Sequence, residues 1–222
     1  MKFKFVKALS LVLMAASILS ITGCSNGYKN SILSSVALYV DEDCTLVDKT
    51  KGRESLTYFY KLDNRDNLYF SVSCSEKKSN SFGGSYDTRN SYEDTIRSLY
   101  TEDINNCIES FDLNITDVES YYSLPGYYVD CYDDEDLNQV LDAIDAASEI
   151  FSVEQEYHEK ECTIIAARFQ INYYVNDEHM LKFNIRIYCE VDREQILADI
   201  HEIIDYCVTE DYWDSMKLYI IN

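Results

Sequence analysis

Hydrophobic and polar residues alternate along several stretches of the chain, and elsewhere hydrophobic residues recur every three or four positions. The first pattern is typical of strands and the second of helices. Alternation predicts strands over 56–62, 68–75, 118–132, 163–175, 180–189 and 216–221, the third interrupted by Pro125-Gly126. The polar residues 63–67 and 176–179 are then the turns of two hairpins.

Helical spacing predicts three helices, over 91–111, 133–151 and 192–208. The second begins with four acidic residues, Asp133 to Asp136, where carboxylates cap and stabilise a helix N-terminus. Residues 35–46 fit a strand and a helix equally well. The stretch 76–90, which contains Gly83-Gly84, is expected to be a mobile loop.

Together these elements predict an α+β fold, an antiparallel sheet with helices packed on one face. From residue 118 onward the order strand, helix, strand, strand, helix, strand is that of a ferredoxin-like unit. The first half would be a degenerate copy of the second, because two sets of residues match at constant separations: Ile96, Tyr100, Ile104, Cys107 and Ile108 with Ile196, Ile200, Ile204, Cys207 and Val208, and Leu68, Phe70, Val72 and Cys74 with Phe183, Ile185, Ile187 and Cys189. A tandem duplication and a chance likeness of two amphipathic patterns both account for this match.

The N-terminus has the layout of a secretory signal. It begins with Lys2, Lys4 and Lys7 and no acid, continues with an apolar run over 8–21, and ends in small residues before Cys24. A membrane-spanning helix needs roughly 20 apolar residues, which is more than this run offers. The pattern therefore favours export followed by cleavage over a permanent transmembrane anchor.

Residues Ile21-Thr22-Gly23-Cys24 resemble the lipobox of bacterial lipoproteins. The resemblance covers only these first residues. It implies cleavage before Cys24 and a diacylglycerol, with long acyl chains such as palmitate, on the Cys24 thiol; two chains anchor a protein stably to a membrane. The alternative is a plain secretory signal with a coincidental cysteine. The resemblance implies a location at the outer face of the cell membrane.

Four segments follow from these patterns. They are a signal peptide at 1–23, a lipidated tether at 24–34, a first hairpin-helix unit at 35–117 and a second, ferredoxin-like unit at 118–222.

The chain is strongly acidic, with 40 Asp and Glu against 19 Lys and Arg and a formal net charge of −21. Binding to nucleic acid requires clustered basic residues that neutralise phosphates, so nucleic acid is not an expected partner. The hydrophobic content of 46% exceeds that of disordered chains, so a folded domain is expected. The acidity favours solubility or cationic partners.

Seven cysteines follow Cys24, and none belongs to a C-x-x-C pair that would indicate zinc or thioredoxin-like chemistry: Cys44, Cys74, Cys107, Cys131, Cys162, Cys189 and Cys207. Disulfides are compatible with an exported protein, but a cysteine on an apolar face is more often a small buried hydrophobic residue. The repeat predicts that Cys74 lies near Cys107, and Cys189 near Cys207.

Catalytic groups are scarce, since the chain has only three histidines, and no catalytic residue, cofactor or metal site is expected. The run from His201-Glu202 to Asp205 differs by one residue from the zinc-binding pattern H-E-x-x-H, which makes a metal-assisted hydrolase an alternative. His158 and Cys162 also stand four apart, but the charged residues between them are typical of a solvated segment.

The second predicted hairpin supplies a candidate binding surface. Period-two alternation places one set of polar side chains on its outward face: Arg168, Gln170, Asn172, Tyr174, Lys182, Asn184, Arg186 and Tyr188. Guanidinium, amide and phenol groups recognise carboxylates, sugars or extended peptides. The sequence thus favours a noncatalytic module that binds a ligand or envelope partner, with a purely structural envelope component as another alternative.

Overall fold

The computed structural model describes residues 27–77, 85–121, 124–158, 161–176, 178–214 and 217–221. The signal peptide, Cys24 and the start of the expected tether lie outside these residues, and the lipid anchor stays a prediction.

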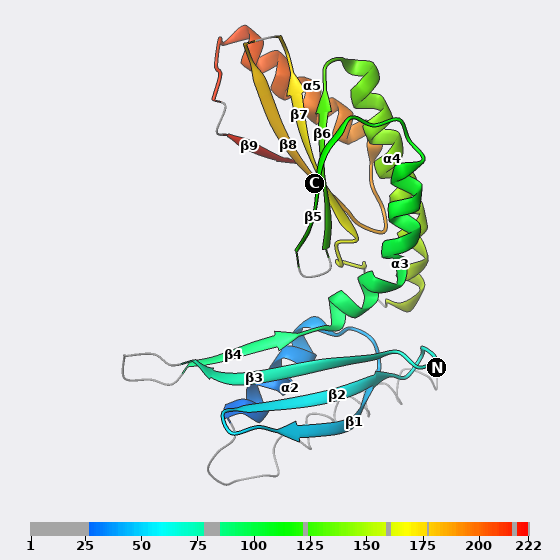
Figure 1. Ribbon diagram of the computed structural model, residues 1–222, viewed down its shortest axis with the longest axis vertical. Helices are drawn as coiled ribbons and strands as arrows, with labels where there is room; N and C mark the ends of the chain where they lie inside the picture. The colour runs from blue at the N-terminus through cyan, green and yellow to red at the C-terminus, as the bar shows by residue number, and fades with distance from the viewer. Residues whose placement is uncertain are drawn as a thin grey trace, which may run out of the picture.

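Two sheets follow one another along the chain (Figure 1). The first is antiparallel throughout and has its strands in sequence order: β1 (Cys44–Lys51), β2 (Ser55–Leu62), β3 (Tyr69–Lys77) and β4 (Ser85–Asn90). The second also keeps sequence order: β5 (Ile115–Tyr121), β6 (Leu124–Cys131), β7 (Ala167–Tyr174), β8 (Met180–Ile187) and β9 (Leu218–Ile221). It is mixed, because β6 and β8 run parallel to β7 and β9 respectively.

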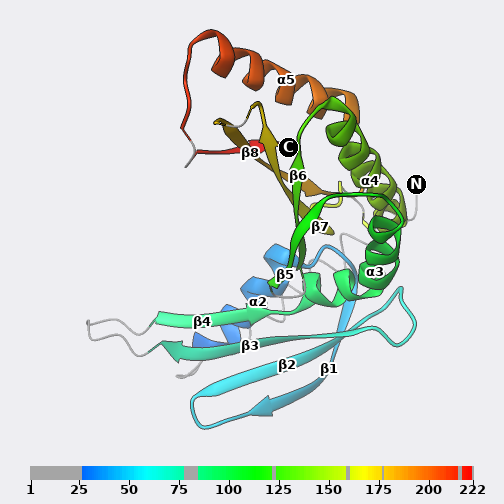
Figure 2. The same cartoon turned by 45° about the horizontal axis from the view of Figure 1, so that its top comes forward.

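The helices lie against these sheets and between them: α2 (Gly27–Tyr39), α3 (Tyr92–Glu109), α4 (Asp134–Ser152), the short 3₁₀ helix η1 (Val153–Tyr157) and α5 (Arg193–Thr209). Helix α2 packs on β2, β3 and β4, whereas α4 and α5 lie on one side of the second sheet (Figures 1 and 2). Helix α3 packs on β3, β6 and α4, so it joins both sheets into one hydrophobic core. The predicted α+β class is confirmed.

The core forms where the sequence alternates. Strand β7 buries every second residue, and β8 does the same up to Ile187. Phe169 and Phe183 are fully buried, and burial of such a side chain contributes roughly 1.5–3 kcal/mol. Asp133 accepts hydrogen bonds from the backbone N–H groups of Glu135 and Asp136, which confirms that this acidic run caps α4.

Two segments predicted to be irregular contain a helix or strands in the parts that the structure describes. Residues 27–34, expected to belong to the tether, form the first turns of α2, because Ile32 is fully buried against the first sheet. The expected loop 76–90 contains the end of β3 and all of β4. An edge strand pairs through its backbone on one side only, so a strand as polar as β4 gives no alternating hydrophobic signal.

The stretch 118–132, expected to be one strand, is a hairpin of β5 and β6. Strand β5 ends at Tyr121 and β6 begins at Leu124, so Pro125-Gly126 lies inside β6 and does not separate the two strands. Pro125 stands second in β6, ahead of the residues that pair with β7, and proline is tolerated at such a position because no ladder hydrogen bond needs its missing N–H.

The ferredoxin-like arrangement is wrong, although the order of elements from β6 to β9 is as predicted. In a split βαβ unit, another strand separates the two parallel strands. Here β6 and β7 are hydrogen-bonded neighbours, and so are β8 and β9. The order of elements along a chain does not specify the position in the sheet of the strand that follows a crossover helix. Here the strand after α4, β7, lies directly beside β6.

The two halves do not share a topology, which contradicts the proposed duplication. In the first half β4 separates β3 from α3, whereas in the second half α5 follows β8 and leads to a parallel strand. Ile108 is fully buried, but its counterpart Val208 is 53% exposed. The sequence match reflects two amphipathic helices and two alternating strands.

Candidate functional site

The predicted outward face of the β7–β8 hairpin is an open sheet surface. Strand register places Arg168 opposite Arg186, Gln170 opposite Asn184, and Asn172 opposite Lys182. The alternate residues of both strands are buried beneath α4 and α5, and no helix among the described residues lies over the polar side. All eight predicted residues, Tyr188 included, are partly or fully exposed. We call this surface the open face.

Neighbouring strands complete the open face with acids. Glu119 on β5 lies 3.7 Å from the Arg168 guanidinium and accepts a hydrogen bond from the Tyr128 hydroxyl. Asp130 on β6 accepts a 2.8 Å hydrogen bond from the amide nitrogen of Asn172. Arg168 of β7 therefore lies beside a carboxylate of β5 and Asn172 beside one of β6, and Arg186 is the exposed member of the basic set.

Aromatic residues extend the open face at one end. The rings of Tyr132 and Tyr174 stack with their centroids 5.0 Å apart, and Tyr132 is 58% exposed. On the opposite edge of the sheet, β9 adds Leu218 and Ile220, both exposed. The surface thus offers charged, amide, phenol and apolar groups side by side.

The open face is shallow. A cavity of about 130 Å³ lies between β6, β7 and β8, lined partly by Arg168, Gln170 and Asn184. Gly126 permits Arg168 to lie flat across β6, since a Cβ atom on Gly126 would come within 2.8 Å of the Arg168 Nε atom. Pockets for small molecules measure roughly 300–1,000 Å³, so this surface suits a flat partner better than an enclosed ligand.

A second group of polar residues, not predicted from the sequence, lies at the junction of the two sheets, and all of its members except Asp41 are buried. The Arg65 guanidinium, from the β2–β3 turn, donates two hydrogen bonds of 2.8 Å to Glu42. It also binds both carboxylate oxygens of Glu154 from η1. His158 follows η1 and lies 2.7 Å from Asp41 through Nδ1 and 3.1 Å from Glu154 through Nε2. We call these five residues the junction cluster.

Two tyrosines of α3 complete the hydrogen bonding of the junction cluster. The Tyr92 hydroxyl donates to Glu42 at 2.7 Å, and the Tyr100 hydroxyl donates to Glu154 at 2.9 Å. Burial raises the pKa of both phenols, and the adjacent carboxylates raise it further. Both tyrosines are therefore neutral donors that fix the carboxylates from the α3 side.

The charges of the junction cluster stabilise one another. Burial alone would lower the pKa of His158, but its interactions with Asp41, Cys162 and Glu154 raise the pKa to about 11. Burial would raise the pKa of Glu154, yet hydrogen bonds from His158 and Arg65 hold that pKa below its usual range. His158 is consequently an imidazolium and Glu154 a carboxylate at neutral pH.

Glu42, Glu154 and His158 bring three possible metal ligands within 4.8 Å of one another. The Arg65 guanidinium already lies between the two carboxylates and binds both. A metal ion would have to displace a cation that is buried and hydrogen-bonded on both sides. The arrangement therefore functions as an internal ion pair network that ties the two sheets together.

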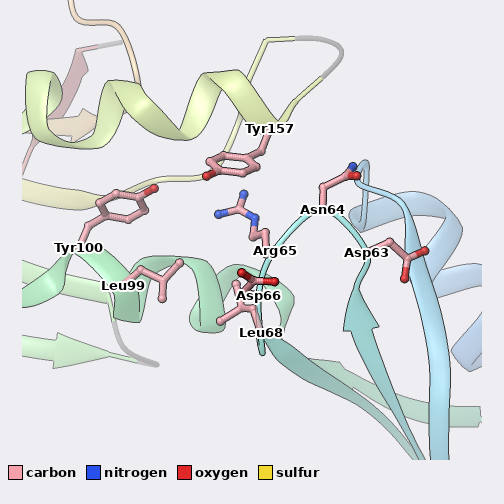
Figure 3. A pocket seen from close by; sticks show the side chains of 8 residues that line it. All are labelled: Asp63, Asn64, Arg65, Asp66, Leu68, Leu99, Tyr100 and Tyr157. Carbon is pink, nitrogen blue, oxygen red and sulfur yellow. The ribbon is translucent and has the colours of Figure 1, made fainter.

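A cavity of about 530 Å³ opens beside this network (Figure 3). Figure 3 shows the Arg65 side chain extending between Tyr100 and Tyr157, and the guanidinium carbon lies 3.7 Å from the Tyr157 ring centroid. Because Glu42 and Glu154 already neutralise Arg65, the cavity offers no uncompensated positive charge to an anionic ligand.

The zinc-like pattern on α5 does not converge. His201 points to Asp134 of α4, with 3.4 Å between Nε2 and Oδ1, and its side chain is 42% exposed. Glu202 and Asp205 are exposed on the same helix. Among the described residues, the group whose ligand atoms lie within 4.8 Å of one another contains His158 and not His201.

The cysteines are free thiols among the described residues, and all but Cys107 are buried, as the hydrophobic interpretation predicted. The contacts that the structure shows for Cys189 and Cys207 are with other residues. Cys189 interacts with Cys162 and lies 3.6 Å from the Phe151 carbonyl oxygen, whereas Cys207 lies 3.5 Å from the Tyr219 hydroxyl. The repeat that suggested these pairs is absent from the fold.

Comparisons with known proteins do not assign this chain. No family model, no curated protein and no solved structure matches it. Within the part of the chain that the structure describes, no helix combines the length and apolar character needed to cross a bilayer.

Acid should weaken the fold through Glu154. A carboxyl whose pKa is lowered on folding stabilises the protein above its usual pKa of about 4.5, and the contribution disappears as the pH falls through the folded value. We expect the urea-unfolding free energy to fall less steeply between about pH 5.5 and pH 3.5 in Glu154→Gln than in the wild type. Glu149→Gln, an exposed control on α4, should keep the wild-type slope; equal slopes for all three proteins would contradict the assignment.

Proposed function

We propose that this protein is a noncatalytic binding module, held by a lipid on Cys24 at the outer face of a bacterial membrane, and that the open face binds another protein. The open face is the observation that supports this proposal. Its basic, amide and phenol side chains lie opposite one another on two paired strands, and no helix among the described residues covers them. Lipid anchoring rests on the lipobox-like Ile21-Thr22-Gly23-Cys24.

The shape of the open face favours a macromolecular partner over a small ligand. Its cavity of about 130 Å³ is below the size of typical small-molecule sites. Arginine and tyrosine are the residue types that dominate the energetics of protein interfaces, and Arg168, Arg186 and Tyr174 lie on one surface. Arginine binds carboxylates in a bidentate manner, so we expect an acidic segment of the partner to lie over β7 and β8.

A triple substitution tests the open face. Replacing Arg168, Arg186 and Tyr174 with Ala should abolish partner capture and leave the thermal midpoint nearly unchanged, because all three side chains are partly exposed. Capture is measured in living cells, with a photo-crosslinking amino acid at Gln170 on the open face and, separately, at the exposed Glu202 on α5. We expect a discrete adduct from position 170 alone.

The matched control replaces the same residue types elsewhere, at Arg53, Arg89 and Tyr206, all exposed and outside the open face. It should retain the adduct. If the open-face variant unfolds, its side chains are structural and the site is wrong. If both variants lose the adduct, or both crosslinking positions give it, the open face is not the binding surface.

A further inference from the structure

We propose that Cys162 and Cys189 form a redox site that reacts with small neutral or cationic disulfides, with Cys162 as the attacking thiolate and Cys189 as the resolving thiol. The site lies beside the junction cluster, and Tyr188, at the end of the open face, is part of its lining.

The two thiols lie together in a cavity of about 250 Å³. Cys162 and Cys189 are buried and interact side chain to side chain, whereas Glu161 and Glu190 in the lining are exposed. The cavity therefore has an acidic, solvent-facing rim. The Cys162 backbone is fixed by a 2.8 Å hydrogen bond from its N–H to the Gln155 side chain.

The surroundings distinguish the two sulfurs. A hydrogen bond from Cys189, together with the imidazolium of His158, lowers the pKa of Cys162. The same interaction raises the pKa of Cys189, and burial adds to the rise. His158 is itself held as a cation by Asp41 and Glu154. Cys162 is thus the thiolate and Cys189 the proton donor, an asymmetry typical of attacking and resolving cysteines.

The rim selects the charge of the reagent. Glu161 and Glu190 flank the cavity, and the whole chain carries a formal charge of −21. Anionic disulfides are repelled from a thiolate in such a field, and cationic ones are attracted to it. The acidic groups facing Cys162 through His158 are Asp41 and Glu154, both already paired with that imidazolium.

The reaction balances as two thiol–disulfide exchanges with a disulfide RSSR. The Cys162 thiolate attacks one sulfur of RSSR, its S–S bond breaks, and RS⁻ leaves, which gives a mixed disulfide on Cys162. Cys189 then loses its proton and attacks the Cys162 sulfur, and the second RS⁻ leaves as the Cys162–Cys189 bond forms. Two cysteines are oxidised and RSSR is reduced to two thiols; one RS⁻ takes the proton released by Cys189 and the other takes a proton from water.

Cystamine, a dication, and 3,3′-dithiodipropionate, a dianion, are the probes. The mature lipidated protein is purified in detergent, fully reduced, and treated with each probe at neutral pH; peptide mass spectrometry then follows every thiol. We expect Cys162 to react with cystamine at least about tenfold faster than the partly exposed Cys107, and faster with cystamine than with the dianion. The product should be a Cys162–Cys189 disulfide.

Single substitutions separate the roles. Cys189→Ser should stop the reaction at a cysteamine adduct on Cys162, and Cys162→Ser should leave Cys189 unmodified. The control Cys131→Ser, at a buried cysteine outside the cavity, should react like the wild type. An adduct on Cys189 in the Cys162→Ser variant would reverse the roles. Absence of the Cys162 adduct in Cys189→Ser, or a preference for the dianion, would overturn the proposal.

Discussion

Arg65→Met should lower the free energy of unfolding by about 3–5 kcal/mol, the usual cost of removing one partner from a buried ion pair. The substitution leaves Glu42 and Glu154 as adjacent buried carboxylates, and Glu154 has no exposed surface. Met matches the length of the aliphatic part of Arg65 and retains packing against Tyr157, so the loss would be mainly electrostatic.

The measurement is urea unfolding followed by far-ultraviolet circular dichroism, with Trp213 fluorescence as a separate probe of the second sheet. Arg193→Met is the matched control: that guanidinium binds Asp142 at the surface, where an ion pair contributes about 0–1 kcal/mol.

Adding Glu42→Gln and Glu154→Gln to Arg65→Met should restore part of the loss, because no unpaired carboxylate remains at those two positions. A loss below about 1 kcal/mol for Arg65→Met, or no recovery in the triple variant, would show that the junction cluster does not hold the sheets together.

Most of the fold could be predicted from periodicity, since the strands and helices with strong alternating or helical spacing are present within a few residues of their expected bounds. Helices α3, α4 and α5 and the two predicted hairpins are examples. The polar edge strand β4 gave no such signal. The order of strands in the second sheet could not be predicted either. The position of β7 after the α4 crossover depends on long-range packing, which local sequence patterns do not encode.

The open face could be predicted because a strand displays its two faces in alternating residues. The junction cluster could not, because its charged residues come from segments that look solvated in isolation. Arg65 lies in a polar turn and Glu154 at an acidic helix end, and only the packing of α3 between the sheets buries them together. The four-residue spacing of Glu154 and His158 was the single local signal available.

Cys24→Ala should abolish lipid attachment completely, because the lipobox-like pattern provides one thiol for the diacylglycerol. Membrane fractionation alone would not test this, since an uncleaved precursor keeps the apolar run 8–21 and can stay bound through it. The measurement is therefore incorporation of an alkyne-labelled fatty acid in growing cells, combined with the mass of the protein.

The wild type should carry the label and lack residues 1–23, whereas Cys24→Ala should be unlabelled and keep its leader. Cys107→Ala, at the most accessible of the described cysteines, should behave as the wild type and so exclude labelling of an internal thiol. A single acyl chain gives only marginal membrane binding and two chains give stable anchoring, so the labelled protein should resist extraction at high salt. Label on Cys24→Ala, or identical processing of all three proteins, would mean that Cys24 follows a plain secretory signal by coincidence.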